Sequence, residues 1–244
     1  MRVRRALNYA IDRGAIIKLT GGPITAQPTC QILPPNFPGY KPYCPYTLRP
    51  GSGGAWTAPD LAKARALVRA SGTRGMKVTF WTCGCFGKGA EARLERATLA
   101  QLGYRVTLKV LFSDDVNAYF AAVDDTLRPG PQIAVAGWTA DYPAASNFFF
   151  QFTCVGARPM RNAVNASRFC DPAIDRKISR AIGLQASGSR ASNDLWQTID
   201  RGAMDQAPWV PLYTPRAIDF VSARVGNYQR HPVLGMLLDQ LWVR

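Results

Sequence analysis

Residues 76–111 read MKVTFWTCGCFGKGAEARLERATLAQLGYRVTLKVL. Apolar and polar side chains alternate over 76–82, the pattern of a strand buried on one face. A helix is expected over 90–102, with Gly103 as its stop signal, and a second strand over 104–111. A strand, a helical crossover and another strand predict neighbouring parallel strands in an α/β fold.

The same alternation continues on both sides of this stretch. An apolar run from Gln132 to Trp138 predicts a buried strand. After Pro208, short extended pieces are expected over 210–213 and 218–221. Asp171 and Pro172 are an N-cap and a first-turn proline. One amphipathic helix is expected over 3–19. Further helices are expected over 59–72, from a cap at Ser113 to Val123, over 172–186 and over 190–206.

The composition indicates a globular protein with a cationic surface. The chain has 244 residues, 47% hydrophobic and 19% charged, with a net charge of +14. The positive residues are scattered, without a basic block or a stripe interleaved with aromatics, so no nucleic-acid partner is expected. No apolar run approaches the roughly 20 residues of a membrane span. The N-terminus shows no signal peptide.

Four of the six cysteines bracket two short loops. Cys30 and Cys44 enclose a proline-rich segment, and Cys154 and Cys170 enclose a polar one. We expect a disulfide in each pair, and a crosslink of this loop size stabilises a fold by roughly 3 kcal/mol. Such bridges favour an oxidising, extracytoplasmic compartment. Because no export signal is visible, we expect the chain to be a fragment of a longer protein.

The remaining pair, Cys83 and Cys85, is separated by one residue. We expect an internal disulfide to be difficult at this spacing. Zinc is the alternative, but the chain has no CxxC pair and a single histidine, His231. No metal site and no cofactor are therefore predicted. His231 also lacks a nucleophile at triad spacing, which argues against a secreted hydrolase.

Six segments in series resemble one protein family. They are VRRALNYAIDR at 3–13, PDLAKA with Leu67-Val68 at 59–68, LGYRV at 102–106, WTADYP at 138–143, Asn165 with SRF and DPAID up to 175, and APWVPLY at 207–213. This set resembles the family 5 solute-binding proteins, the oligopeptide, dipeptide and nickel receptors of ABC importers. Each motif alone is weak, whereas six in the right order cover nearly the whole chain.

The resemblance implies a periplasmic-binding-protein-like fold of type II, in which two α/β lobes close on a solute like a clam. Residues 1–207 would form the second lobe, with a mixed sheet and flanking helices. Residues 208–244 would be the crossover and the extended C-terminal segment that returns to the first lobe. That first lobe and an ABC transporter permease are the implied protein partners, and the implied location is periplasmic or anchored at the outer face of the cell membrane.

The binding candidates follow the predicted strand over 132–138. Trp138 and Asp141 lie just beyond its carboxyl end, where open α/β sheets present ligand-contacting residues. In peptide-binding relatives the matching Asp pairs with the amino terminus of the ligand. The alternatives are that Trp138 packs in the core and that Asp141 caps a helix. Tyr142 and Asn147 are further candidates, while Phe148-Phe149-Phe150 is expected to be mostly core.

These features predict a solute-recognition lobe for a peptide or another small solute, without catalysis. Binding needs only a cleft that excludes water and satisfies the polar ends of the solute. The alternative is a sensor lobe of the same fold fused to a regulatory or signalling protein.

Overall fold

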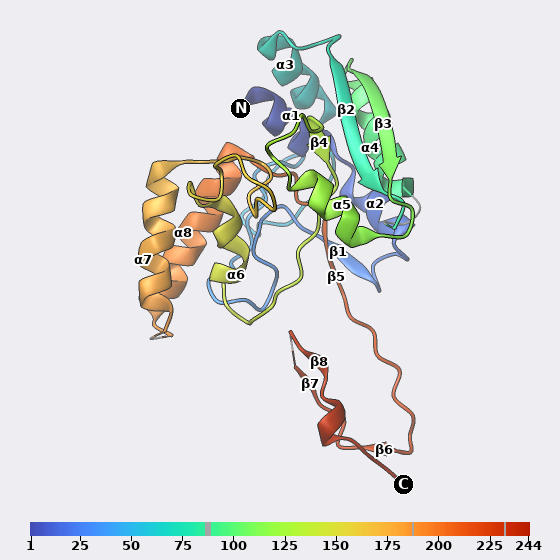
Figure 1. Cartoon of the computed structure of the whole chain (residues 1–244), viewed down its shortest axis with the longest axis vertical. Helices are drawn as coiled ribbons and strands as arrows, with labels where there is room; N and C mark the ends of the chain where they lie inside the picture. The colour runs from blue at the N-terminus through green and yellow to red at the C-terminus, as the bar shows by residue number, and fades with distance from the viewer. Residues whose placement is uncertain (86–88, 187, 232) are drawn as a thin grey trace.

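A computed structural model describes residues 1–85, 89–186, 188–231 and 233–244. At its centre is a parallel three-stranded sheet in the order β3-β2-β4. The central strand β2 (Lys77–Cys83) places Phe80 opposite Leu108 of β3 (Arg105–Leu111) and Ile133 of β4 (Ile133–Ala134). Figure 1 shows helices packed beside this sheet, as the predicted α/β fold requires.

Two helices connect the strands. The first, α4 (Ala90–Gln101), leads from β2 to β3, as predicted, and the second, α5 (Val116–Val123), leads from β3 to β4. The predicted Ser113 cap of α5 is wrong, because Asp115 caps this helix by accepting the Ala118 N–H at 2.9 Å. The buried Tyr119 of α5 has its hydroxyl 2.8 Å from the Val135 carbonyl, which ties α5 to the chain leaving β4.

The predicted strand over 132–138 is wrong in length and in burial. Regular pairing covers only Ile133 and Ala134, both partly buried. Val135 donates its N–H to the Trp81 carbonyl at 3.0 Å, after which the chain leaves the sheet. Residues 136–139 are exposed. The apolar run predicts a longer strand, but the chain leaves the sheet after Val135.

The N-terminal helix is split, whereas the sequence predicts one helix. Helix α1 (Arg2–Ala10) ends at the extended residue Ile11, and α2 (Arg13–Leu19) begins after Asp12, whose side chain accepts the Ala15 N–H at 2.9 Å. The break buries Arg13, which donates from Nε to the carbonyls of Thr29 and Pro211, both at 2.8 Å. Burial lowers the pKa of Arg13 to about 10. Because the apolar periodicity continues through this break, the sequence pattern did not predict it.

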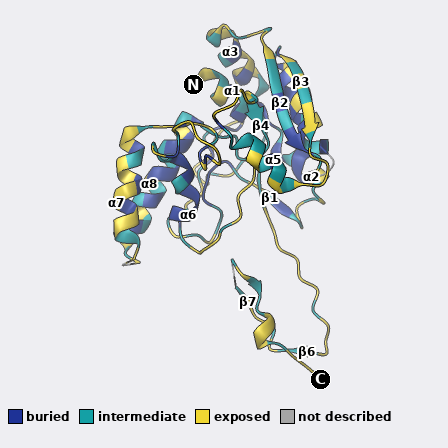
Figure 2. Ribbon diagram, in the orientation of Figure 1, coloured by how far each residue is buried: buried dark blue, intermediate teal, exposed yellow. Residues whose placement is uncertain are grey.

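The other long helices agree with the sequence. Helix α3 (Leu61–Ser71) ends at Gly72 in the left-handed conformation, and α7 (Pro172–Gln185) has Asp171 as its N-cap and proline in its first turn. Helix α8 (Arg190–Gln206) packs against α7. Trp196 of α8 is fully buried and stacks on Phe149 with ring centroids 5.6 Å apart. Figure 2 shows this side of the body with its buried faces turned inward.

Three disulfides are present among the described residues. Two of them join the pairs predicted from the loops, Cys30 with Cys44 and Cys154 with Cys170. The third joins Cys83 to Cys85, contrary to the expectation from their spacing. The chain turns tightly at the intervening Gly84, where a Cβ would lie 2.8 Å from the Ser113 Cα. This turn brings the two cysteine Cα atoms to 5.1 Å, within the usual range for disulfides.

The C-terminal segment leaves the body. Strand β5 (Tyr213–Pro215) pairs antiparallel with β1 (Ala26–Pro28), and the chain then runs outward to two small antiparallel pairs (Figure 1). These pairs join β6 (Val225–Gly226) to β9 (Trp242–Val243) and β7 (Arg230–His231) to β8 (Gly235–Met236), with a 3-10 turn at Leu238–Gln240. The predicted extended piece at 210–213 reaches β5, whereas 218–221 forms no regular element.

Candidate functional site

The four candidate residues lie together in one stretch, from the loop after β4 to α6 (Ser146–Phe149). The amide of Asn147 connects three of them. Its Oδ1 accepts the Trp138 Nε1–H at 2.9 Å and the Asp141 backbone N–H at 3.0 Å, and its Nδ2 donates to Asp141 Oδ2 at 3.1 Å. The fourth residue, Tyr142, has its hydroxyl 3.3 Å from Ser146 Oγ. The sequence treated these side chains as separate candidates, whereas the structure joins Trp138, Asp141 and Asn147 in one hydrogen-bonded unit next to Tyr142.

This unit rests on a buried support. Asn147 is 2% exposed, and the adjoining Phe148 and Phe149 are 7% and 0% exposed, as expected for core residues. The next aromatic, Phe150, begins the 3-10 helix η2 (Phe150–Phe152) and meets the Trp138 ring edge to face, with centroids 5.2 Å apart. Short helical turns with apolar side chains on the core side therefore hold Asn147 in place from below.

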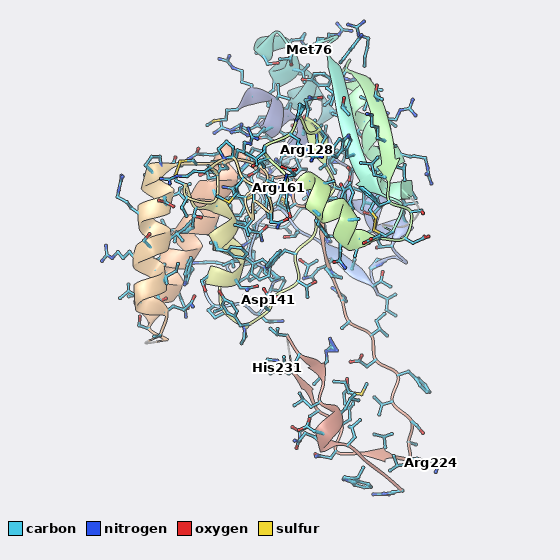
Figure 3. All side chains as sticks on the ribbon, viewed as in Figure 1. Met76, Arg128, Asp141, Arg161, Arg224 and His231 are labelled. Carbon is cyan, nitrogen blue, oxygen red and sulfur yellow. A yellow bond between two sulfur atoms is a disulfide. The ribbon has the colours of Figure 1, made fainter. Side chains whose placement is uncertain are left out.

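The outer side of the unit faces solvent. Trp138 is 39% exposed and Tyr142 45%, and Asp141 is also exposed. Figure 3 shows Asp141 at the lower edge of the body, on the side toward which the C-terminal segment extends. One Asp141 oxygen is bonded to Asn147, and the other, Oδ1, has no hydrogen bond among the described residues. A carboxylate held in this way can accept a donor from a ligand.

The structure bears on the alternative roles of Asp141 and Trp138. Asp141 is not a helix cap, because Ala145 is the N-cap of α6 and no side chain caps that helix. Trp138 packs against Phe150 and bonds to Asn147 through its indole N–H, yet remains 39% exposed. Sequence reasoning gave Asn147 a minor place, yet its amide is the hub of the unit. No sequence signal marked this connecting role, because the turn over 139–146 brings Asn147 to its two partners, Trp138 and Asp141.

Buried acids lie elsewhere in the fold. Glu95 of α4 is 8% exposed, and its Oε1 has no partner in the described structure. Burial, and to a lesser extent the neighbouring Glu91, raise the pKa of Glu95 to about 8. Glu91 accepts the Tyr213 hydroxyl at 3.2 Å, so this pair of acids faces the β5 crossover. Glu95 is therefore largely protonated at neutral pH.

The described residues contain no group of three or more histidine, cysteine or acidic side chains that could hold a metal ion. Within the same residues, no helix combines the length and the apolar character needed to cross a bilayer.

Comparison with known sequences places the chain among binding proteins. It is 25% identical to a probable di/tripeptide-binding protein of Pseudomonas aeruginosa over 95% of this chain and 40% of that protein. It is 22% identical to a glutathione-binding protein of Salmonella typhi, over 98% and 44%, and 26% identical to a heme-binding protein of Haemophilus influenzae, over 95% and 40%. The chain thus spans about two fifths of the length of these relatives.

Solved structures show the same fold. A transporter-associated periplasmic binding protein from Helicobacter pylori, in complex with the peptide STSA, superimposes with a TM-score of 0.72 at 23% identity, over 99% of this chain and 44% of that one. A dipeptide-binding protein from a Pseudoalteromonas species, in complex with Met-Leu, gives a TM-score of 0.73 at 19% identity, over 100% and 45%. At these identities the match establishes the periplasmic-binding-protein fold alone.

The family itself is established by sequence. The middle region of the bacterial extracellular solute-binding proteins of family 5 matches residues 1–158, well over half of the chain. The members of this family bind solutes and are not enzymes. The chain belongs to the bacterial extracellular solute-binding proteins of family 5.

Proposed function

We propose that the chain is the peptide-binding second lobe of an ABC-importer receptor, and that Asp141 receives the amino terminus of the peptide. The observation that carries this proposal is the Asn147 amide, which holds the Asp141 backbone and one carboxylate oxygen, while Oδ1 has no hydrogen bond from the residues that the structure describes. A preorganised carboxylate loses little freedom on binding an ammonium group. Trp138 and Tyr142 add partly exposed aromatic surface in the same loop.

The strength of this contact depends on a closed cleft. An exposed carboxylate pairs with an ammonium group only weakly in water, whereas removal of water strengthens the same pair several-fold. A first lobe covering Asp141 would supply that exclusion. We therefore expect the isolated 244-residue chain to bind peptides weakly, and a protein that carries both lobes to bind them tightly.

Burial supports the division of the chain into 1–207 and 208–244. Ala207 is fully buried, and no described residue after it is buried. Several large apolar side chains of the C-terminal segment face solvent, among them Phe220 at 95% and Leu238 at 71% exposure. Exposed apolar residues of this size are typical of a surface that another part of the protein covers. This proposal implies that the first lobe covers these side chains.

The names of the relatives support a receptor for peptides more than a sensor module. They are described as di/tripeptide-binding, glutathione-binding and heme-binding proteins, so peptides and peptide-like molecules predominate among them. The three disulfides favour an oxidising compartment, which agrees with the proposal of a receptor that works outside the cytoplasm and delivers its solute to a membrane permease.

The test compares free and blocked peptides. Calorimetry would measure a dipeptide and its N-acetylated form binding to a protein that contains this chain and a first lobe. Asp141→Asn should weaken the free dipeptide by about tenfold or more, since a hydrogen bond to a charged group contributes about 1.5–3 kcal/mol. Asp194→Asn, an exposed acid on α8, is the matched control. Unchanged affinity in Asp141→Asn would remove Asp141 from the site.

A further inference from the structure

A hollow of about 450 Å³ lies away from the Asp141 loop. The apolar part of its lining comes from Trp81 of β2, Ala121 and Ala122 of α5, and Pro129. Two cations, Arg128 and Arg161, lie at its rim, and none of the four loop candidates lines it. Figure 3 shows the two arginines near the middle of the body, apart from Asp141.

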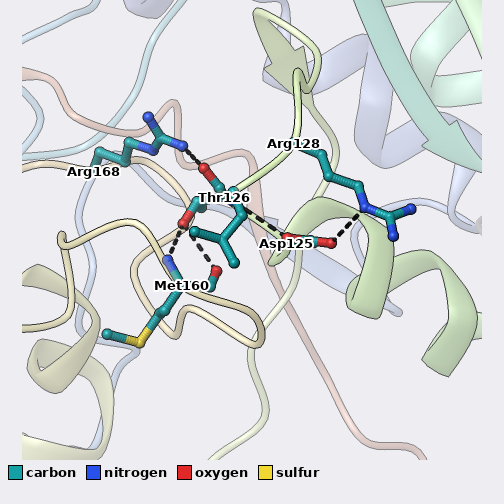
Figure 4. Close-up of polar contacts among 6 residues, drawn as sticks. Asp125, Thr126, Arg128, Met160 and Arg168 are labelled. Atoms are coloured by element: carbon teal, nitrogen blue, oxygen red, sulfur yellow. Dashed lines mark hydrogen bonds and ion pairs between the residues drawn. The ribbon is translucent and has the colours of Figure 1, made fainter.

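The two walls of this hollow are joined by hydrogen bonds from both backbone and side-chain groups, several of which Figure 4 shows. Thr126 donates its N–H to the Met160 carbonyl at 3.0 Å, and its Oγ1 accepts the Met160 N–H at 2.9 Å. Ala163 donates its N–H to the Asp124 carbonyl at 2.8 Å, and Arg168 donates to the Thr126 carbonyl. The wall with Arg161 also lies within the loop closed by the Cys154–Cys170 disulfide. The two arginines thus lie on segments that these hydrogen bonds and the disulfide hold together.

The charges in the hollow leave an excess of one cation. Arg128 uses Nε to reach Asp125 Oδ2 at 3.2 Å, which leaves its two terminal nitrogens available. The other Asp125 oxygen accepts the Leu127 N–H at 3.3 Å, so this carboxylate is engaged within its own wall. Arg161 is exposed and has no hydrogen bond or ion pair among the described residues. One acid against two guanidinium groups makes the rim attractive to an anion.

We propose that this hollow binds a small organic anion, a carboxylate or a phosphate carried on a flat apolar group. The anion would bridge Arg128 and Arg161, because planar guanidinium groups match the geometry of both acids. The apolar part would lie on Trp81 and Pro129. Since the arginines are exposed, the affinity should be modest, with a Kd on the order of 1 mM.

The experiment titrates the full 244-residue chain with benzoate and with phenyl phosphate at low ionic strength, followed by amide chemical shifts. Benzyl alcohol is the neutral control for both. The two anions distinguish the two kinds of ligand group. Tighter binding of benzoate assigns the site to carboxylates, and tighter binding of phenyl phosphate assigns it to phosphates. In either case the shifts should centre on Trp81, Ala121 and Ala122.

Matched variants test the arginines. Arg161→Gln and Arg128→Gln should each weaken the tighter anion by about fivefold or more. Arg158→Gln should leave it unchanged, because Arg158 is an exposed arginine of the same disulfide loop that does not line the hollow. Circular dichroism would verify that each variant folds. The proposal is wrong if neither anion binds tighter than benzyl alcohol, or if Arg158→Gln weakens binding as much as Arg161→Gln.

Discussion

Asn147 holds Asp141 from two directions, accepting its backbone N–H at 3.0 Å and donating to its carboxylate at 3.1 Å. A single buried amide therefore sets both the path of the loop and the orientation of the acid. The same amide oxygen accepts the Trp138 indole N–H. The position of the exposed Asp141 is thus decided by a side chain that solvent hardly reaches.

Replacing Asn147 by alanine should release this loop. The three hydrogen bonds of the amide would be lost, with an expected destabilisation of about 1–3 kcal/mol. In a protein that contains both lobes, peptide affinity should fall by a factor similar to that of Asp141→Asn, and the double variant should be little worse than either single one. Urea unfolding and calorimetry measure the two effects. Lower stability with full peptide affinity would reduce Asn147 to a packing role.

The stability of the chain should depend on pH through Glu95. Its folded pKa of about 8 lies above its unfolded value of 4.5, so the native state binds more protons between these values. The free energy of unfolding should then fall as pH rises from 4.5 to 8, by at most about 1.4 kcal/mol per pH unit. The raised pKa values of Asp124 and Asp200, about 6 each, act at the acidic end of this range.

Glu95→Gln tests this dependence, because glutamine resembles the protonated acid. Between pH 6 and 8, urea unfolding should give a flatter profile for the variant and a more stable variant at pH 8. Asp194→Asn, at an exposed site, should keep the wild-type slope. Parallel profiles for wild type and Glu95→Gln would mean that Glu95 does not titrate in this range.

The disulfides should contribute unequally. Cys30–Cys44 spans a sequence separation of 14, whereas Cys83–Cys85 spans 2. Because a crosslink restricts the unfolded chain more when its loop is longer, replacing the first pair by alanine should cost about 3 kcal/mol, and replacing the second pair much less. Denaturant midpoints of the two double variants under oxidising conditions give the comparison. Equal losses would contradict the loop-length argument.

Removal of the C-terminal segment should leave the body intact. A chain ending at Ala217 keeps the β1–β5 pair and loses 218–244, where no described residue is buried. The free energy of unfolding should change by no more than about 0.5 kcal/mol, as for surface changes in general. Urea denaturation of both chains measures this. A large loss of stability would show that 218–244 packs on the body, against the proposed assignment to a first lobe.

Local signals in the sequence were enough for most helices. Asp60 and Gly72 mark the ends of α3, and Asp171 with Pro172 starts α7, because capping groups and turn conformations act over a few residues. The parallel pairing of β2 with β3 followed from the alternation of strands and helices, whereas the position of β4 on the other side of β2 did not. The family motifs, notably WTADYP at 138–143, selected the loop in which the proposed binding residues lie.

The sequence by itself therefore determined the α/β class, the family, two disulfide pairings and the loop that carries Asp141. Only the tertiary structure decided the break before Arg13, the early end of β4, the hub role of Asn147 and the pairing of Cys83 with Cys85. The physical reason is the separation along the chain of the groups that interact. Caps and periodicity depend on neighbours in the chain, whereas Arg13 breaks the helix to reach carbonyls at Thr29 and Pro211, partners that only the folded chain brings within 2.8 Å.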